Sequence, residues 1–351
     1  MTILCPWITV WCCPVSSLYN KLDGMDENGD TYTPSYILLS LSAFAIAGNL
    51  TVILMVAQYR FLRMTRTHWL LAALAAADFL RAAFVMVFVG VSGAVGVWFG
   101  GDLWCKISGS LPFLLFMVCY LLHTMIAVDQ RHIVMGFFSN YRMKQVSALF
   151  MVLLVVVVSL FVVEVPYLTM ELLTETTIRY NNTTAHCEMY TPQQTYHRVH
   201  VYDVMYVLCY MFVPGLVIFG CYCYIYARLR RFYAQDQVLR QIPGGEWYQD
   251  QDIIAYNVKV FLLLALVFLI SWIPCSVLTL RKLFDIKYVL SDWRLEMFSK
   301  WLVYISPVIS PYVLIISYPP FRQAFKLMCC CKSEKEISFQ TLSSIQGTVN
   351  L

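Results

Sequence analysis

The sequence predicts a bundle of seven membrane-spanning helices. Hydrophobic residues make up 60% of the 351-residue chain and charged residues only 13%, which is far from the composition of soluble globular domains. Seven apolar runs are long enough to cross the hydrocarbon core of a bilayer as helices. They are residues 36–59, 69–98, 107–128, 146–170, 201–226, 253–280 and 298–318. We therefore expect an all-α, polytopic membrane protein with its termini on opposite sides of the membrane.

Positive charges between these runs indicate the orientation. If the N-terminus is outside, fourteen of the 25 Lys and Arg residues lie in inner segments and nine in outer segments. Positive charge is retained in the cytoplasm, so we predict a plasma-membrane protein with an extracellular N-terminus and a cytoplasmic C-terminus. The net charge of +4 follows from this topology, and no basic patch with interleaved aromatic side chains indicates nucleic-acid binding.

The first two runs carry polar residues within apolar sequence. Asn49 follows Gly48 in the first run, and a buried asparagine in a membrane helix normally bonds a neighbouring helix. Asp78 and Arg81 in the second run share a helical face at i, i+3 spacing. Intramembrane ionisable residues indicate a functional site by default, but these two could also simply neutralise each other.

The third run carries His123 at a depth similar to that of Asp78. A buried histidine is more often a hydrogen-bonded core residue than a switch, and both interpretations remain open. Cys105 at the outer end of this run and Cys187 in the next outer loop both face the oxidising side, where one disulfide would join them. Asn181 and Asn182 form overlapping glycosylation sequons in the same loop. No Cys and His spacing resembles a metal site.

The last three runs contain prolines. Pro214 lies at the centre of the fifth run, with Tyr222 towards its inner end. In the sixth run Pro274 frees a carbonyl and bends the helix, which places Trp272 on the inner side of a hinge; the alternative is a buried helix that tolerates its proline. Pro311 in the seventh run predicts a further distortion.

The chain is divided into four predicted regions: an extracellular tail 1–34, a seven-helix domain 35–318, a membrane-surface helix 319–331 and a disordered cytoplasmic tail 332–351. The double proline Pro319-Pro320 ends the seventh run, and residues 321–328 have the periodicity of an amphipathic helix. A cysteine cluster follows and is predicted to be palmitoylated, at Cys329, Cys330 and Cys331.

Together these residues resemble the rhodopsin-like (class A) G-protein-coupled receptors over residues 36–331. The matches are Gly48-Asn49, Leu74-Ala75 with Asp78, Trp104-Cys105, Cys187, Pro214 with Tyr222, Phe268 with Trp272 and Pro274, Pro311, and Phe321-Arg322. The resemblance implies a non-enzymatic receptor without a cofactor. A ligand would enter from outside, the sixth helix would swing outward, and a heterotrimeric G protein would dock. Arrestin, membrane lipid or sterol, and a second receptor copy are further candidate partners.

The resemblance also assigns candidate site residues. The ligand pocket would draw on Phe113, Phe116, Glu164, Tyr167, Tyr206, Tyr210, Trp272, Trp301 and Tyr304. The activation switch would comprise Asp78, Arg81, Tyr120, His123, Pro214, Phe268, Trp272, Pro274, Ser310 and Pro311. Coupling to the G protein would use Asp129, Gln130, Arg131, Phe138, Tyr222 and Lys259.

Several positions depart from the family pattern. The family's Asp-Arg-Tyr falls on Asp129-Gln130-Arg131, which displaces the arginine by one residue, about 100° around a helix. The Asn-Pro-x-x-Tyr of the seventh helix falls on residues 310–314, without the Asn or the Tyr, and the fourth-run tryptophan is missing. We expect the inner ionic latch to be absent or redrawn. We also hypothesise that Arg81, with His123 as a second candidate, replaces the sodium ion of the family's pocket, and that His123 causes ligand-independent signalling.

The ligand class is predicted mainly by exclusion. The family's amine-binding aspartate position falls on Pro112 and its retinal-binding lysine position on Tyr304, which argues against an amine or retinal. A lipid, a small apolar molecule or a peptide remains. One alternative is a receptor-like scavenger or modulator that does not couple to G proteins. The other is an ion or proton transporter, although no repeated half with paired broken helices is found.

Overall fold

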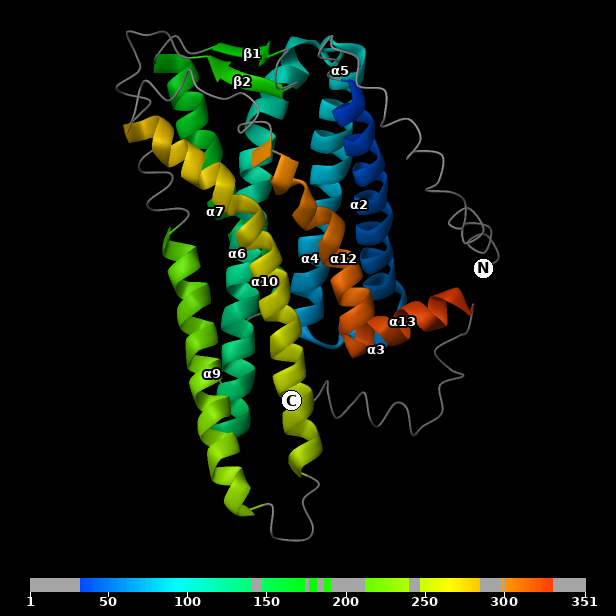
Figure 1. Cartoon of the computed structure of the whole chain (residues 1–351), viewed down its shortest axis with the longest axis vertical. Coiled ribbons are helices and arrows are strands. Elements are labelled where there is room, and N and C mark those ends of the chain that lie inside the picture. The colour runs from blue at the N-terminus through cyan, green and yellow to red at the C-terminus, as the bar shows by residue number, and fades with distance from the viewer. Residues whose placement is uncertain are drawn as a thin grey trace.

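The computed structural model describes residues 32–139, 147–173, 177–181, 186–190, 212–239, 247–284, 298–299 and 301–330. In these ranges the chain forms a helical bundle with a β-hairpin at one end (Figure 1). The elements are α2 (Tyr32–Gln58), α3 (Arg60–Arg63), α4 (Arg66–Arg81), η3 (Ala82–Met86), α5 (Val87–Val95), α6 (Gly101–Ser139), α7 (Ala148–Leu173), β1 (Thr177–Asn181), β2 (His186–Tyr190), α9 (Val213–Leu239), α10 (Trp247–Phe284), α12 (Ile305–Ser317) and α13 (Pro319–Cys329). The predicted all-α membrane fold is confirmed.

The described helices also pass a length and hydropathy test for membrane spans. Five are long and apolar enough to cross a membrane, and the count rises to six if a bent helix pair is included. That pair, Trp301–Ser317 and Pro319–Cys329, is bent by 89°. The predicted short helix after the seventh run therefore exists as α13, and its position on the membrane surface stays a prediction. The fifth predicted run is described only from residue 212, and the predicted tails lie outside the described residues.

The second run forms α4, a single π-helical turn η3 and α5 in succession. The π turn begins at Ala82, directly after Arg81, and α5 ends at the left-handed Gly96 (φ 77°). π turns within α-helices are frequent at functional sites because they change the direction in which neighbouring side chains project. The π turn therefore marks Arg81 as a candidate functional residue.

Helix α2 packs closely against the proline of α12. Pro311 has no N–H and leaves the carbonyl of Pro307, four residues earlier, without its helical donor. Asn49 Nδ2 donates to this carbonyl at 2.9 Å and to Ala45 O of its own helix at 2.9 Å. A Cβ on Gly48 would lie 2.7 Å from Pro311 Cγ. The predicted interhelical role of Asn49 is confirmed, and Gly48 allows the close approach that it needs.

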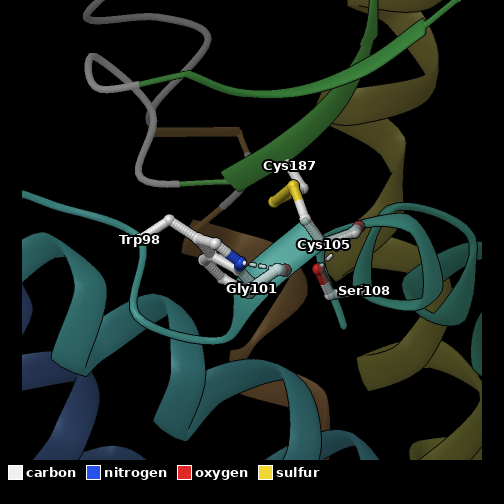
Figure 2. Close-up of a disulfide and its surroundings, with 5 residues drawn as sticks. All are labelled: Trp98, Gly101, Cys105, Ser108 and Cys187. Atoms are coloured by element: carbon white, nitrogen blue, oxygen red, sulfur yellow. Dashed lines mark hydrogen bonds between the residues drawn. A yellow bond between two sulfur atoms is a disulfide. The ribbon is translucent and has the colours of Figure 1, made fainter. Parts of the chain in front are cut away.

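The antiparallel hairpin β1–β2, which pairs Tyr180 with Cys187, closes the end of the bundle that is predicted to be extracellular. We call this end the outer end and the opposite one the inner end. The predicted disulfide between Cys105 and Cys187 is confirmed, and it ties β2 to the outer part of α6 (Figure 2). Beside it, Trp98 Nε1 donates to Gly101 O at 2.8 Å, which holds the turn into α6. Of the predicted glycosylation sites, Asn181 ends β1 and Asn182 lies outside the described residues.

Candidate functional site: a polar and aromatic core between the helices

Five rings from α6 and α10 form a cluster in the middle of the bundle. We call Phe116, Tyr120, His123, Phe268 and Trp272 the aromatic cluster. The Phe116 and Trp272 ring centroids are 3.9 Å apart, and Phe116 stacks on Phe268 at 5.7 Å. Phe268 also contacts Tyr120 at 5.6 Å and His123 at 4.8 Å. All five side chains are buried.

The residue spacing explains why these rings meet. The three α6 residues are separated by four and three positions and the two α10 residues by four, so each set lies on one helical face. The three α6 rings therefore face the two α10 rings across the contact between these helices. Because the rings fill the space between the helices, movement of either helix requires the cluster to repack.

The helices around the aromatic cluster are also weakened by prolines. Pro274 lacks an N–H, and near it Ser271 and Ser276 donate to the carbonyls of Phe268 and Trp272 at 2.7 and 2.8 Å. On α9, a Cβ on Gly215 would lie 2.6 Å from the Tyr120 hydroxyl, so the glycine after Pro214 lets α9 approach the cluster. Trp272 Nε1 is buried without a hydrogen-bond partner among the described residues.

A buried ion pair lies beside the aromatic cluster. Arg81 Nη2 donates to Asp78 Oδ1 at 2.6 Å, as the i, i+3 spacing predicts, and both side chains are almost fully buried. Cys119 Sγ on α6 lies 3.6 Å from the same carboxylate oxygen. The ion pair and the Cys119 thiol therefore connect α4 to α6.

The hairpin reaches into the outer end of the bundle. His186 of β2 lies with Nε2 2.6 Å from the Tyr304 hydroxyl, and the two rings stack at 7° with centroids 6.2 Å apart. Tyr304 is buried. His186 was not predicted from the sequence, although its neighbour Cys187 was; a residue next to that disulfide has to lie over the bundle.

The predicted pocket residues differ in how deeply they are buried. Phe116, Trp272 and Tyr304 are buried, Glu164 and Trp301 are half-buried, and Phe113 is 46% exposed. Tyr206 and Tyr210 lie outside the described residues, as does the Tyr167 side chain. The structure thus brings the buried members together at the aromatic cluster and below the hairpin.

At the inner end of the bundle, Asp129 of α6 is held by α4. Arg66 Nε donates to Asp129 Oδ1 at 2.7 Å, with a second contact from Arg66 Nη2, and Thr67 Oγ1 donates to Asp129 Oδ2 at 2.5 Å. The Asp129 side chain is 1% exposed and that of Arg66 is 20% exposed. Both carboxylate oxygens thus accept from the start of α4. Neither Arg66 nor Thr67 was singled out in the sequence.

The neighbours of Asp129 point elsewhere. Gln130 is buried, and the Arg131 guanidinium lies 4.9 Å from the centroid of the Tyr224 ring on α9. The Tyr222 hydroxyl is buried and has no hydrogen-bond partner among the described residues. Of the other predicted coupling residues, Lys259 is exposed and the Phe138 side chain lies outside the described part of the chain.

A second inner contact joins α4 to the α12–α13 corner. His68 Nδ1 lies 2.9 Å from Leu62 O, and Nε2 lies 3.0 Å from the hydroxyl of Tyr318. The Tyr318 ring packs on Phe261 of α10 and on Phe321 of α13. No periodicity or motif in the sequence predicts this contact.

The remaining predicted switch residues lie in α12. Ser310 Oγ donates to Ser306 O of its own helix at 2.8 Å, beside Pro311. Its single hydroxyl proton is therefore not donated to Asp78. The Ser306 hydroxyl itself is buried and unpartnered among the described residues. No group of three or more metal-ligating side chains is found in the described residues.

Comparison with known proteins decides the family. The family model "7 transmembrane receptor (rhodopsin family)" matches residues 48–314, which is most of the chain. The chain belongs to the rhodopsin family of seven-transmembrane receptors. It is therefore a multi-pass membrane protein of the class A G-protein-coupled receptors, and not an enzyme.

Individual relatives of this receptor are distant. It is 23% identical over 340 residues to 5-hydroxytryptamine receptor 4 of Cavia porcellus, an alignment that covers 90% of this chain and 85% of that receptor. It is 26% identical over 296 residues to trace amine-associated receptor 1 of Homo sapiens, covering 81% and 83%. It is 25% identical over 328 residues to the high-affinity lysophosphatidic acid receptor of Xenopus laevis, covering 89% and 84%.

The fold of the receptor is also similar to a solved structure. The crystal structure of squid rhodopsin superposes with a TM-score of 0.73 at 17% identity, and the match covers 92% of this chain and 93% of that one. This similarity concerns the fold alone. Heterotrimeric G-protein coupling follows from the family, whereas the ligand does not.

Proposed function

We propose that this receptor transmits a signal from its outer half to a heterotrimeric G protein through repacking of the aromatic cluster. The single observation that carries the proposal is the stack of Phe116, Trp272 and Phe268 between α6 and α10. Pro274 lies two residues beyond Trp272 and weakens α10 there. A ligand that shifts these rings changes the tilt of α10, and the inner half of the helix moves away from α6.

The ligand is proposed to be a lipid, a small apolar molecule or a peptide. Relatives are named for amines and for lysophosphatidic acid, so their names favour neither class. Two features argue against an amine. The family's amine-binding aspartate position holds Pro112, and the buried carboxylate of Asp78 is already paired with Arg81. Retinal is disfavoured because Tyr304 occupies the position of the retinal-binding lysine.

Elevated ligand-independent signalling is part of the proposal. His123 packs its ring 4.8 Å from that of Phe268, at a position where the family usually has an aliphatic residue. An imidazole fills this contact less completely than a branched aliphatic side chain, and burial of its polar nitrogens costs desolvation free energy. The resting arrangement of α6 and α10 is therefore less stable, and the active state is more populated.

A receptor that recruits arrestin or modulates another receptor without activating G proteins is the second candidate. It is favoured by one observation, which is that Gln130 occupies the position of the family's arginine while Arg131 lies over Tyr224. The two candidates make opposite predictions for G-protein dissociation.

Sensors of G-protein dissociation and arrestin recruitment test the proposal in cells without added ligand. We expect a signal from at least one G protein that changes severalfold in Trp272→Phe. Trp69→Phe is the matched control, since Trp69 is exposed and its Nε1 donates to Arg63 O outside the aromatic cluster. An arrestin signal without any G-protein signal would favour the second candidate, and equal effects of the two substitutions would exclude the aromatic cluster as the transmission element.

A further inference from the structure

The hairpin places one of its own side chains inside the outer end of the bundle. His186 Nε2 lies 2.6 Å from the Tyr304 hydroxyl, and the two rings are nearly parallel, at 7°, with centroids 6.2 Å apart. This arrangement is typical of offset-stacked rings. Tyr304 is 4% exposed and His186 is half-buried. The imidazole thus makes the two contacts, one ring stack and one hydrogen bond, that a small planar ligand would make with Tyr304.

Two further contacts hold His186 in this position. Cys187, the next residue of β2, forms the disulfide with Cys105 of α6 (Figure 2). On the paired strand, the Tyr180 hydroxyl donates to Ser92 O of α5 at 3.3 Å. A group that is tethered beside its binding site has a high effective concentration and loses little freedom on binding. The contact of His186 with Tyr304 is therefore favoured over the same contact made by a free molecule.

Tyr304 connects this contact to the aromatic cluster. It directly precedes α12 and belongs to a buried hydrophobic group that includes Val85 of η3 and Leu115 of α6. Leu115 directly precedes Phe116, whose ring centroid lies 3.9 Å from that of Trp272. A close-packed interior transmits small displacements from one side chain to the next. A group that fills the space beside Tyr304 therefore influences the packing of the aromatic cluster.

We propose that His186 is a built-in ligand of this receptor, with Tyr304 as its binding residue, and that its contact contributes to ligand-free signalling. The inference rests on the proposed function, in which an outer signal repacks the aromatic cluster. The ligand chemistry is a planar ring with a hydrogen-bonding nitrogen, and the chain itself supplies it. This agrees with elevated ligand-free signalling, because a receptor whose site is already filled does not depend on an added molecule. An external ligand that reaches Tyr304 has to displace His186.

Rescue by free imidazole tests the occupancy of the site without any signalling readout. His186→Ala removes the ring and leaves a cavity beside Tyr304, and a cavity of this kind can bind a small ring from solution. Thermal unfolding of the purified full-length receptor is measured with and without imidazole at about pH 8, where imidazole is mostly uncharged. We expect imidazole to raise the unfolding midpoint of His186→Ala by about 2 °C and to leave that of the wild type unchanged.

Two variants are the controls for this shift. His186→Phe keeps a ring against Tyr304 and fills the space, so imidazole should not change its midpoint. Tyr180→Phe removes the other hydrogen bond of the hairpin, to Ser92 O, and leaves His186 in place, so it should not respond either. No imidazole shift in His186→Ala, or an equal shift in the wild type or in either control, would overturn the proposal.

Ligand-free G-protein dissociation at matched surface expression tests the contribution to signalling. We expect His186→Ala to signal about threefold less than the wild type, the size of effect expected from one hydrogen bond. Imidazole should restore part of this loss in His186→Ala and have no effect on His186→Phe. A rise in His186→Ala would make the contact a restraint and would overturn the proposal. If the wild type activates no G protein, the proposed function fails, whereas the unfolding shift still decides whether His186 occupies a ligand site.

Discussion

The middle and the inner end of this receptor differ in how closely they follow the family pattern. In the middle, Phe268, Trp272 and Pro274 stand where the family has them, and the aromatic cluster forms around them. At the inner end, the family's arginine is replaced by Gln130 and Asp129 bonds Arg66 and Thr67. The comparison indicates that the proposed moving part of the switch and the contacts proposed to restrain it can change independently.

The difference also has a physical cause. The aromatic cluster depends on ring shape and on the i, i+4 spacing of two helices, so each member constrains its neighbours. A buried carboxylate needs only donors of suitable geometry and charge, which several nearby elements can provide. The inner contact can therefore be rebuilt from α4 without altering the middle of the bundle.

The largest effect is expected from Phe268→Ala, which probes the middle. Phe268 is fully buried and contacts four other rings, so its removal leaves a cavity. We expect a loss of about 3 kcal/mol in the free energy of unfolding. Thermal unfolding in detergent measures this, with Phe161→Ala as control because Phe161 is 70% exposed on α7. Equal losses in the two variants would contradict the central position of the cluster.

Arg66→Ala probes the inner end and should have the next largest effect. The substitution leaves the Asp129 carboxylate buried with Thr67 as its remaining described partner, and we expect about 2 kcal/mol of destabilisation. The value is reduced because Arg66 itself is partly exposed. Asp129→Asn removes the charge along with the ion pair and should cost less. If Asp129→Asn is the more destabilising change in the same unfolding assay, the carboxylate is not held as described.

His123→Leu sharpens the comparison by changing the middle towards the family pattern. We expect ligand-free G-protein activation to fall about fivefold, which corresponds to ~1 kcal/mol of extra stability for the resting state. The measurement is G-protein dissociation at matched surface expression. Unchanged basal signalling would show that the imidazole does not weaken the contact with Phe268.

The smallest effect is expected from Tyr318→Phe. The phenyl ring keeps its packing on Phe261 and Phe321, and only the hydrogen bond to His68 is lost. We expect a loss of about 1 kcal/mol or less in the unfolding free energy. Tyr312→Phe is the control, because the Tyr312 hydroxyl donates to Phe44 O at an exposed position. A larger loss of unfolding free energy in Tyr312→Phe than in Tyr318→Phe would show that the His68–Tyr318 hydrogen bond does not stabilise the inner end.

The sequence predicted the features that depend on length, periodicity and strong local chemistry. The helical bundle, the Asp78–Arg81 pair, the Cys105–Cys187 disulfide and the α13 helix all follow from spacing or composition. The interhelical bond of Asn49 was predicted from its polarity alone, although its acceptor, the Pro307 carbonyl, was not.

The contacts that were missed join residues far apart in the chain. Arg66 and Asp129 are 63 positions apart, His68 and Tyr318 are 250, and His186 and Tyr304 are 118. None of these pairs has a fixed spacing, so they depend on how the helices pack and not on a local pattern. The sequence did predict that the Asp129 latch is absent or redrawn, but it did not identify the replacement.

The measurement that tests the central claim most directly is ligand-free G-protein activation in Arg66→Ala and Arg131→Ala, at matched surface expression. Arg66 holds Asp129 at the inner end, whereas Arg131 lies over Tyr224. We predict that Arg66→Ala raises basal activation severalfold and that Arg131→Ala does not. A rise in Arg131→Ala with no change in Arg66→Ala would contradict the account, because the inner restraint would then still depend on the displaced arginine.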